Sequence, residues 1–142
     1  MPALIVPVFI QVALTFALMF WMGAARTACI RRGEASFEDV ALANDIYDAK
    51  TRAIGAAFHN QFELPVLFYV VVALSLATGA ATHILAGLAW VFVLMRIAHA
   101  YIHVTTNFVP RRFLFFLGSA LALIAMWLVF GVAFILNWDM AA

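Results

Sequence analysis

Apolar residues fill four long stretches of the chain, and polar residues gather between them. Each stretch reaches the roughly 20 residues that a helix needs to cross the hydrocarbon core of a bilayer. We expect membrane spans at about 4–25, 54–80, 84–105 and 113–138. The pattern therefore predicts an all-α membrane protein with a single domain, 1–142, built as a four-transmembrane-helix bundle.

Composition supports this prediction and excludes other classes of protein. The 142 residues are 68% hydrophobic and only 11% charged, whereas soluble domains are about a quarter charged. A separate soluble domain is therefore not expected. The net charge is +1, and the few basic residues are dispersed, so we expect no nucleic acid as a partner.

The positions of lysine and arginine predict how the chain crosses the membrane. The basic residues outside the spans occupy two connections: Arg26, Arg31, Arg32, Lys50 and Arg52 in the first, and Arg111 and Arg112 in the other. Cytoplasmic loops are enriched in lysine and arginine. We therefore expect the loops 26–53 and 106–112 in the cytoplasm and both termini on the non-cytoplasmic side.

Part of the long first loop is expected to be helical. Ser36 followed by Asp39 resembles a capping box, and Asn44-Asp45 is a second plausible helix start. A helix beginning there could continue into the second span, so that Arg52 would already be helical.

The second span carries a polar face and a proline. At 100° per residue, one arc of about 100° holds four polar side chains: Arg52, His59, Asn60 and Glu63. Pro65 has no N–H, so the Gln61 carbonyl loses its helical partner. We expect a bend here and a hydrogen-bond donor from elsewhere for the freed carbonyl.

The third span carries a matching polar stripe, formed by Arg96, His99, His103 and Asn107 within about 80°. Glu63 and Arg96 each lie about ten residues, or about 15 Å, from the predicted cytoplasmic boundary. A lone charge at that depth costs at least a few kcal/mol. We therefore expect Glu63 and Arg96 to lie close together, within one subunit or across an interface.

Two interpretations of these polar residues remain open. They could form a structural ion pair that joins two helices, or they could line a hydrated cavity that opens to the cytoplasm. The two imidazoles of the stripe favour the cavity. His99 and His103, with His59 as a third ligand, could also hold a metal ion, but Arg96 on the same stripe would repel it. We expect no metal.

The order of these motifs resembles a known family. Asn60-x-x-Glu63 followed by a proline, and Arg96-x-x-His99 later in the chain, resemble the MAPEG family, the membrane-associated proteins in eicosanoid and glutathione metabolism. "NQFELPVLFY" looks especially like the small bacterial members, and "RIAHAYIHVTTNFVPRRFLFFLG" looks like the third helix, the loop and the start of the fourth helix. The resemblance covers nearly the whole chain.

The resemblance implies a homotrimer that binds glutathione between subunits, near the cytoplasmic end. It places the family's glutathione contacts at Asn60 and Glu63, its third-helix arginine at Arg96, and at Arg112 the catalytic arginine that favours a thiolate. Together with the polar faces, it gives the candidate cofactor-binding residues Arg52, His59, Asn60, Glu63, Arg96, His99 and His103. Ala56 stands where the family usually has an arginine, and His103 stands where many members have a tyrosine.

Two functions follow from this resemblance. The first is a membrane-bound glutathione-dependent transferase or peroxidase that acts on hydrophobic electrophiles or lipid hydroperoxides at the cytoplasmic membrane face. The second is a non-catalytic protein that binds a lipid-like ligand or serves as an accessory subunit of a larger membrane complex. The likeness to small bacterial members implies the bacterial inner membrane as the location, with the lipid bilayer and a hydrophobic small molecule as partners.

Overall fold

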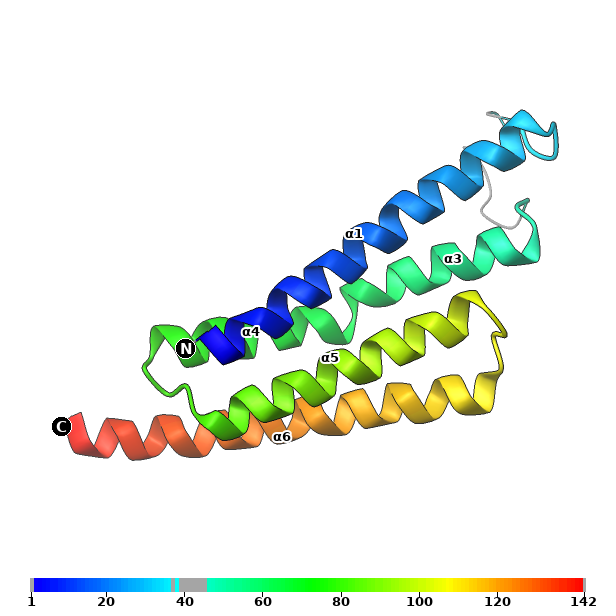
Figure 1. The fold of residues 1–142 in the computed structure, drawn as a ribbon. Helices are drawn as coiled ribbons and strands as arrows, with labels where there is room; N and C mark the ends of the chain where they lie inside the picture. Colours follow the sequence, from blue (N-terminus) through cyan, green and yellow to red (C-terminus); the bar gives the residue numbers. More distant parts are fainter. Residues whose placement is uncertain (1, 37, 39–45, 142) are drawn as a thin grey trace.

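The computed structural model describes residues 2–36, 38 and 46–141, and within them the chain is helical apart from short connections. The elements are α1 (Pro2–Arg31), α3 (Ala49–His59), the 3₁₀ helix η1 (Asn60–Phe62), α4 (Leu64–Ala77), α5 (His83–Val104) and α6 (Val109–Ala141). With α3, η1 and α4 taken as one segment, four segments of the described residues are long and apolar enough to cross a membrane. Both chain ends lie at one end of the bundle (Figure 1).

The first connection is shorter than the predicted loop 26–53, because helix extends into it from both sides. Helix α1 continues to Arg31, and α3 begins at Ala49. The Asp48 carboxylate caps α3 by accepting the backbone N–H of Thr51 at 2.8 Å, which satisfies one of the unpaired donors of the first turn. Arg52 is helical, as expected. Asp39 and the pair Asn44-Asp45 lie outside the described residues.

The predicted bend in the second span is confirmed, and it is an interruption of the helix. Helix α3 ends at His59, one 3₁₀ turn follows, and α4 begins at Leu64 with Pro65 in its first turn. The backbone of Glu63, with φ −97° and ψ −107°, lies outside the helical region. Proline is tolerated at the start of a helix but not in its interior, so Pro65 sets the point where α4 begins.

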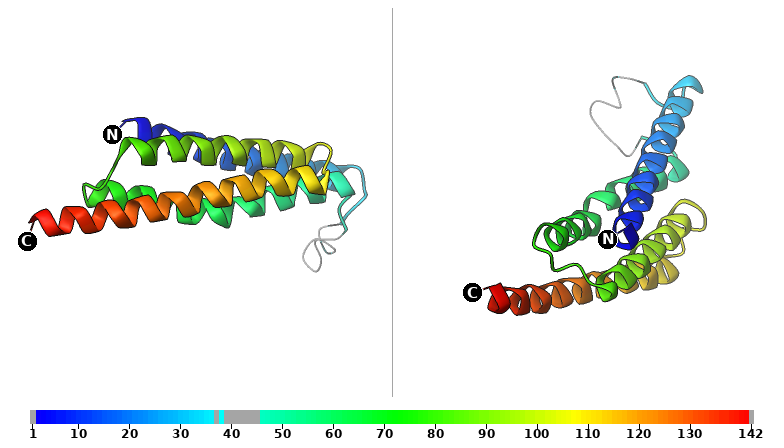
Figure 2. Two further views of the ribbon diagram at one scale, coloured as in Figure 1. Left: turned by 90° about the horizontal axis from the view of Figure 1, so that it is seen from below. Right: turned by 60° about the vertical axis from the view of Figure 1, so that its left-hand side comes forward.

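Helix α5 packs along α6 and also contacts α1 and α3 (Figure 2). One large apolar cluster joins α4 to α5 and α6 through residues such as Phe68, Phe92 and Met126. A smaller cluster joins α1, α3 and α5 through residues such as Leu18, Ile54 and Ala100. Along each of α1, α5 and the second span, buried polar residues separate the two clusters.

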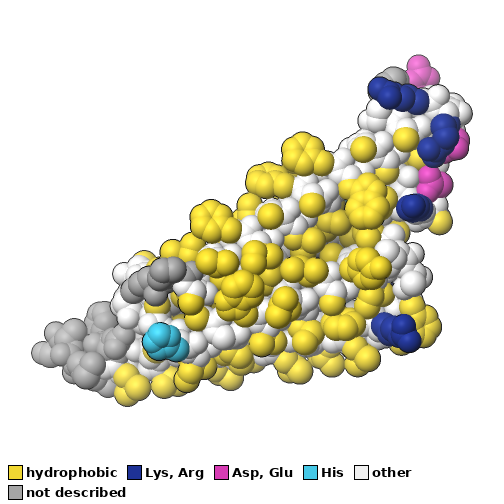
Figure 3. All heavy atoms as spheres, viewed as in Figure 1, with side chains coloured by type: hydrophobic (Ala, Val, Ile, Leu, Met, Phe, Trp, Pro, Cys, Tyr) yellow, Lys and Arg dark blue, Asp and Glu magenta, His cyan; other side chains and the backbone are white. Residues whose placement is uncertain are grey.

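The surface of the bundle has an apolar part and a charged part. Apolar side chains cover most of the visible length of the bundle, whereas lysine, arginine and acidic side chains gather at the end opposite the two chain termini (Figure 3). This apolar band with a charged end is what a lipid-facing bundle requires.

Candidate functional site

The break in the second span presents its backbone to Arg96. Nη2 of Arg96 donates to the carbonyl oxygen of Asn60 at 2.6 Å. The Arg96 side chain is fully buried, at 0% exposure. The sequence predicted that a carbonyl at the break would receive a hydrogen bond from elsewhere, but it pointed to the carbonyl of Gln61. The carbonyl that receives it belongs to Asn60, because the helix changes to a 3₁₀ turn there, several residues before Pro65.

The Glu63 carboxylate does not form an ion pair with Arg96 inside the chain. Glu63 is exposed, and among the described residues no carboxylate lies within 4.0 Å of the Arg96 guanidinium. Two guanidinium nitrogens of Arg96, Nε and Nη1, are buried without a hydrogen-bond partner in the described part of the chain. A pair between two subunits therefore stays a prediction.

His99 and His103 form a buried pair of imidazoles that joins α5 to α6. Nδ1–H of His99 donates to the backbone carbonyl of Arg112 at 3.0 Å. Because a carbonyl can only accept, this bond places the proton on Nδ1. The two rings meet edge to face, with centroids 5.7 Å apart. Nε2 of His99 and Nδ1 of His103 are buried and have no partner among the residues described.

The Arg112 side chain lies beside these imidazoles but points towards the connection before α6. Nη1 of Arg112 donates to Oδ1 of Asn107 at 2.5 Å. Asn107 has a positive φ of 48°, a conformation that asparagine tolerates better than most residues. The stripe residue Asn107 therefore holds the predicted catalytic arginine through a neutral amide, which leaves its charge unneutralised.

Two other predicted residues, Arg52 and His59, lie in a separate pocket between α1 and α3. The pocket has a volume of about 340 Å³. Its lining residues are Arg26, Tyr47, Thr51, Arg52, Gly55, Ala56 and His59. Three of these seven side chains can carry positive charge, so the pocket is suited to an anionic group.

Arg26 is the pocket residue that sequence reasoning missed. Its guanidinium lies 5.2 Å from the Tyr47 ring centroid. A Cβ added to Gly55 would lie 3.6 Å from Nη2 of Arg26, which places this nitrogen beside the residue that precedes Ala56. Arg26 thus brings a guanidinium close to where the family usually has one on the second helix. The available signal was a basic residue directly after the first apolar stretch, but only the continuation of α1 shows its direction.

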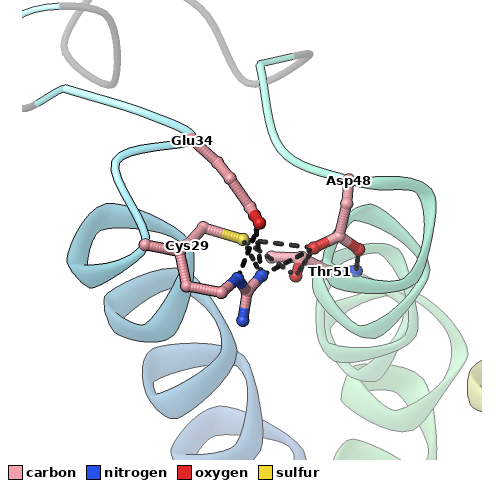
Figure 4. A network of polar contacts seen from close by, with 5 residues as sticks. Cys29, Glu34, Asp48 and Thr51 are labelled. Atoms are coloured by element: carbon pink, nitrogen blue, oxygen red, sulfur yellow. Dashed lines mark hydrogen bonds and ion pairs between the residues drawn. The ribbon is translucent and has the colours of Figure 1, made fainter.

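A polar network joins the end of α1 to the start of α3 (Figure 4). Cys29 lies inside α1 and is fully buried. Its thiol donates to Oδ2 of Asp48 at 3.2 Å. The backbone N–H of Thr51, followed by the Cys29 thiol and the Thr51 hydroxyl, lowers the pKa of Asp48 to about 2.

Three residues of this network could also hold a metal ion. The ligand atoms of Cys29, Glu34 and Asp48 all lie within 4.8 Å of one another. The guanidinium of Arg32, however, donates to both acidic groups, at 2.7 Å to Glu34 and at 3.5 Å to Asp48. The hydrogen bonds from Arg32 lower the pKa of Glu34. Since a cation already bridges these carboxylates, the network is read as a link between helices.

The structure therefore brings the predicted residues together in two groups. Arg96, His99, His103 and Arg112 gather with the Asn60 carbonyl at α5 and α6, whereas Arg52 and His59 line the α1–α3 pocket. Glu63 stands exposed at the break. A helical bundle of membrane-spanning length whose core holds a buried arginine and two imidazoles is an integral membrane protein with an intramembrane polar site.

Comparison with known proteins identifies the family. The model of the MAPEG family matches residues 4–132 of the 142-residue chain. The chain belongs to the MAPEG family. Comparisons with curated proteins and with solved structures give no match.

Proposed function

We propose that the protein is a membrane-bound glutathione-dependent transferase or peroxidase that acts on hydrophobic electrophiles or lipid hydroperoxides at the cytoplasmic membrane face. The observation that carries this proposal is a group of buried polar atoms, five of the seven in the described chain that lack a partner: Nε and Nη1 of Arg96, Oδ1 of Asn60, Nε2 of His99 and Nδ1 of His103. The other two are Nε of Arg26, in the α1–α3 pocket, and Oε1 of Gln11. Buried polar groups are almost always hydrogen-bonded. This set of donors and acceptors matches a charged, amide-containing ligand.

The residues of the chain fit the groups of glutathione. The tripeptide has two carboxylates, one ammonium group, two amides and a thiol. Arg26, Arg52 and His59 would hold a carboxylate in the α1–α3 pocket, and the exposed Glu63 would bind the ammonium group. Arg96 and Asn60 would bind the remaining polar groups at the break. Guanidinium–carboxylate contacts are strong because they can be bidentate and charge-assisted.

Glutathione supplies a thiol, and a thiolate is the nucleophile that attacks an electrophile. Arg112 donates to the neutral amide of Asn107, and no carboxylate of the described residues lies within ion-pair distance of it. Its unneutralised charge would favour a thiolate nearby. Arg112 therefore has the catalytic role in this proposal. His99 and His103, each with a buried ring nitrogen that has no partner among the described residues, would donate or accept hydrogen bonds in place of the phenol that many relatives use.

We further propose that the site is completed by a homotrimer with both basic connections in the cytoplasm. Within one chain the two groups of residues lie on different helix pairs, α1–α3 and α5–α6. A neighbouring subunit could bring its own Arg112 group to the exposed Glu63 and the α1–α3 pocket. A hydrophobic second substrate would enter from the lipid, so that the protein positions reactants from two phases.

A non-catalytic role is the second candidate. The protein would then bind a lipid-like ligand or serve as an accessory subunit of a larger membrane complex. Two substitutions favour it: Ala56 lacks the usual guanidinium of the second helix, and His103 lacks a phenol. The position of Arg26 weakens the first of these arguments.

The decisive experiment is a titration of glutathione into the purified, detergent-solubilised protein. We expect saturable heat together with the ultraviolet absorbance of a thiolate. S-methylglutathione is the matched control, because it should release heat without the absorbance change. Heat without thiolate formation for glutathione would favour the non-catalytic role, and no heat at millimolar glutathione would refute the proposal.

Glu63→Gln separates a binding site from a structural pair. We expect loss of glutathione binding with the oligomer intact by size-exclusion chromatography with light scattering. Collapse of the oligomer would instead assign Glu63 to a structural ion pair between subunits.

A further inference from the structure

The face of α5 opposite the Arg96 stripe forms, with α6, a pocket that the proposed glutathione site does not use. Its volume is about 560 Å³. The lining residues are Ala98, Tyr101, Ile102, Thr105, Thr106, Arg111 and Phe115. Tyr101 points outward, with 67% of its surface exposed. The pocket is therefore reached from the lipid side of the single chain.

Arg111 gives this pocket an unneutralised positive charge. Its guanidinium lies 5.9 Å from the Phe108 ring centroid, and in the described part of the chain no carboxylate lies within ion-pair distance of it. The sequence has no Asp or Glu between Glu63 and Asp139. The first turn of α6 also holds Arg112 and no acidic residue, although the start of a helix is the positive end of its dipole. The charges together favour an anion.

The lining changes from apolar to polar along the pocket. Ala98, Ile102 and Phe115 give apolar walls, whereas Thr105 and Thr106 lie just past the end of α5, next to Arg111. From Ala98 to Thr105 the axis of α5 rises about 10 Å. The Thr105 hydroxyl donates to the carbonyl of Tyr101 at 2.6 Å. The hydroxyls of Tyr101 and Thr106 have no hydrogen-bond acceptor among the described residues and are the donors left for a ligand. An amphiphile with an anionic head matches this order.

We propose that this pocket binds an anionic phospholipid of the cytoplasmic leaflet. Arg111, with the hydroxyls of Tyr101 and Thr106, binds the phosphate, and an acyl chain lies against Ala98 and Phe115. Basic residues at the cytoplasmic boundary of a membrane protein attract anionic headgroups. A lipid is favoured over free phosphate because the larger part of the wall is apolar.

The test is native mass spectrometry of the detergent-purified protein titrated with phosphatidylglycerol, or with phosphatidylcholine of the same acyl chains. We expect a saturable site for phosphatidylglycerol that binds phosphatidylcholine at least about fivefold more weakly, the effect of one basic residue near the headgroups. Arg111→Gln should lower the affinity for phosphatidylglycerol about fivefold. The matched control is Arg31→Gln, which removes an exposed arginine at the same end of the bundle and should leave the affinity unchanged.

A second variant tests the apolar wall. Ala98→Phe narrows the acyl-chain region without a change of charge, so it should weaken the binding of phosphatidylglycerol. Three results would overturn the proposal. Arg111→Gln and Arg31→Gln could lose equal affinity for phosphatidylglycerol, the wild-type protein could bind the two lipids equally well, or Ala98→Phe could leave the affinity for phosphatidylglycerol unchanged. Displacement of the lipid by millimolar inorganic phosphate would also overturn it, because the site would then be one for free phosphate. Because Arg111 has no part in the proposed glutathione site, glutathione binding should be unchanged in Arg111→Gln.

Discussion

The two parts of the second span, α3 and α4, follow one another along the chain but make different kinds of contact with the other helices. The buried face of α4 is apolar except for Ser75, whose hydroxyl donates to the Val71 carbonyl of its own helix at 2.6 Å. The contact of α4 with α5 is also apolar: the ring of Phe68 stacks on that of Phe92, with ring centroids 4.6 Å apart. On the α3 side of the break, Gln61 accepts from Gln11 of α1, and the Asn60 carbonyl accepts from Arg96 of α5. Polar groups in that half depend on other helices.

The comparison shows where stability and function separate. In the α4 half, close packing stabilises the bundle, and no buried charge opposes it. In the half around Arg96, a buried guanidinium with two unpaired nitrogens costs free energy in the single chain. Such a cost is expected at a ligand site or a subunit interface, where binding supplies the missing partners.

The largest effect on stability is expected from Phe92→Ala, in the apolar half. Loss of the ring leaves a cavity against Phe68 and should lower the free energy of unfolding by about 3 kcal/mol. Unfolding by denaturant in detergent measures the change. Leu94→Ala, at a side chain that is 56% exposed, is the control and should change little. A larger loss in glutathione affinity than in stability would contradict the division into two halves.

Arg96→Met should show the opposite pattern. In the proposed glutathione site the variant would remove charge-assisted hydrogen bonds to the ligand, each worth about 1.5–3 kcal/mol. Glutathione should then bind about tenfold to a hundredfold more weakly in calorimetry. Stability should be unchanged or higher, because a buried and partly unpaired charge is lost. A strong loss of stability with unchanged binding would instead make Arg96 a structural residue.

Gln11→Leu tests the boundary between the halves. Gln11 donates to Oε1 of Gln61 at 2.8 Å, and hydrogen bonds between membrane helices contribute about 1 kcal/mol. We expect a loss of about that size in the free energy of unfolding. A double-mutant cycle with Gln61→Leu isolates the pair. Additive losses would show that the two side chains do not stabilise the break together.

The smallest effect is a pH dependence at the start of α3. The pKa of Asp48 is lowered from 3.8 to about 2, so its stabilising contribution is complete above about pH 4 and is lost as the pH falls towards 2. For an exposed N-cap we expect about 0.5 kcal/mol. Asp48→Asn keeps a capping oxygen, so this part of the acid dependence should vanish from its thermal unfolding between pH 2 and 5. An unchanged profile would exclude Asp48 as the cause.

Much of this molecule could be predicted from local signals in the sequence. The four apolar stretches predicted the spans because their length and hydropathy are local properties. Pro65 predicted the interruption, since a proline has no N–H to donate. The spacing of Arg96, His99 and His103 placed them on one face of α5, and all three are buried. The continuation of α1 to Arg31 was missed because charged residues can continue a helix beyond the membrane.

Contacts between helices were less predictable. Depth alone paired Glu63 with Arg96, but the backbone at the break turned the Asn60 carbonyl, not a carboxylate, towards the guanidinium. Arg26 was missed because its role depends on where α1 crosses α3. The carbonyl of Arg112, as the partner of His99, carries no sequence signal, because every residue has a carbonyl.

By itself, the sequence determined the class of the protein, the number of spans, the interruption at Pro65 and the family. Hydrophobic length, helical period and proline chemistry act over a few residues and can be read without coordinates. The tertiary structure decided the partners: the Asn60 carbonyl for Arg96, Gln61 for Gln11, and Arg26 beside Ala56. Such pairings depend on the angles and offsets at which helices pack, which arise from contacts between residues far apart in the chain.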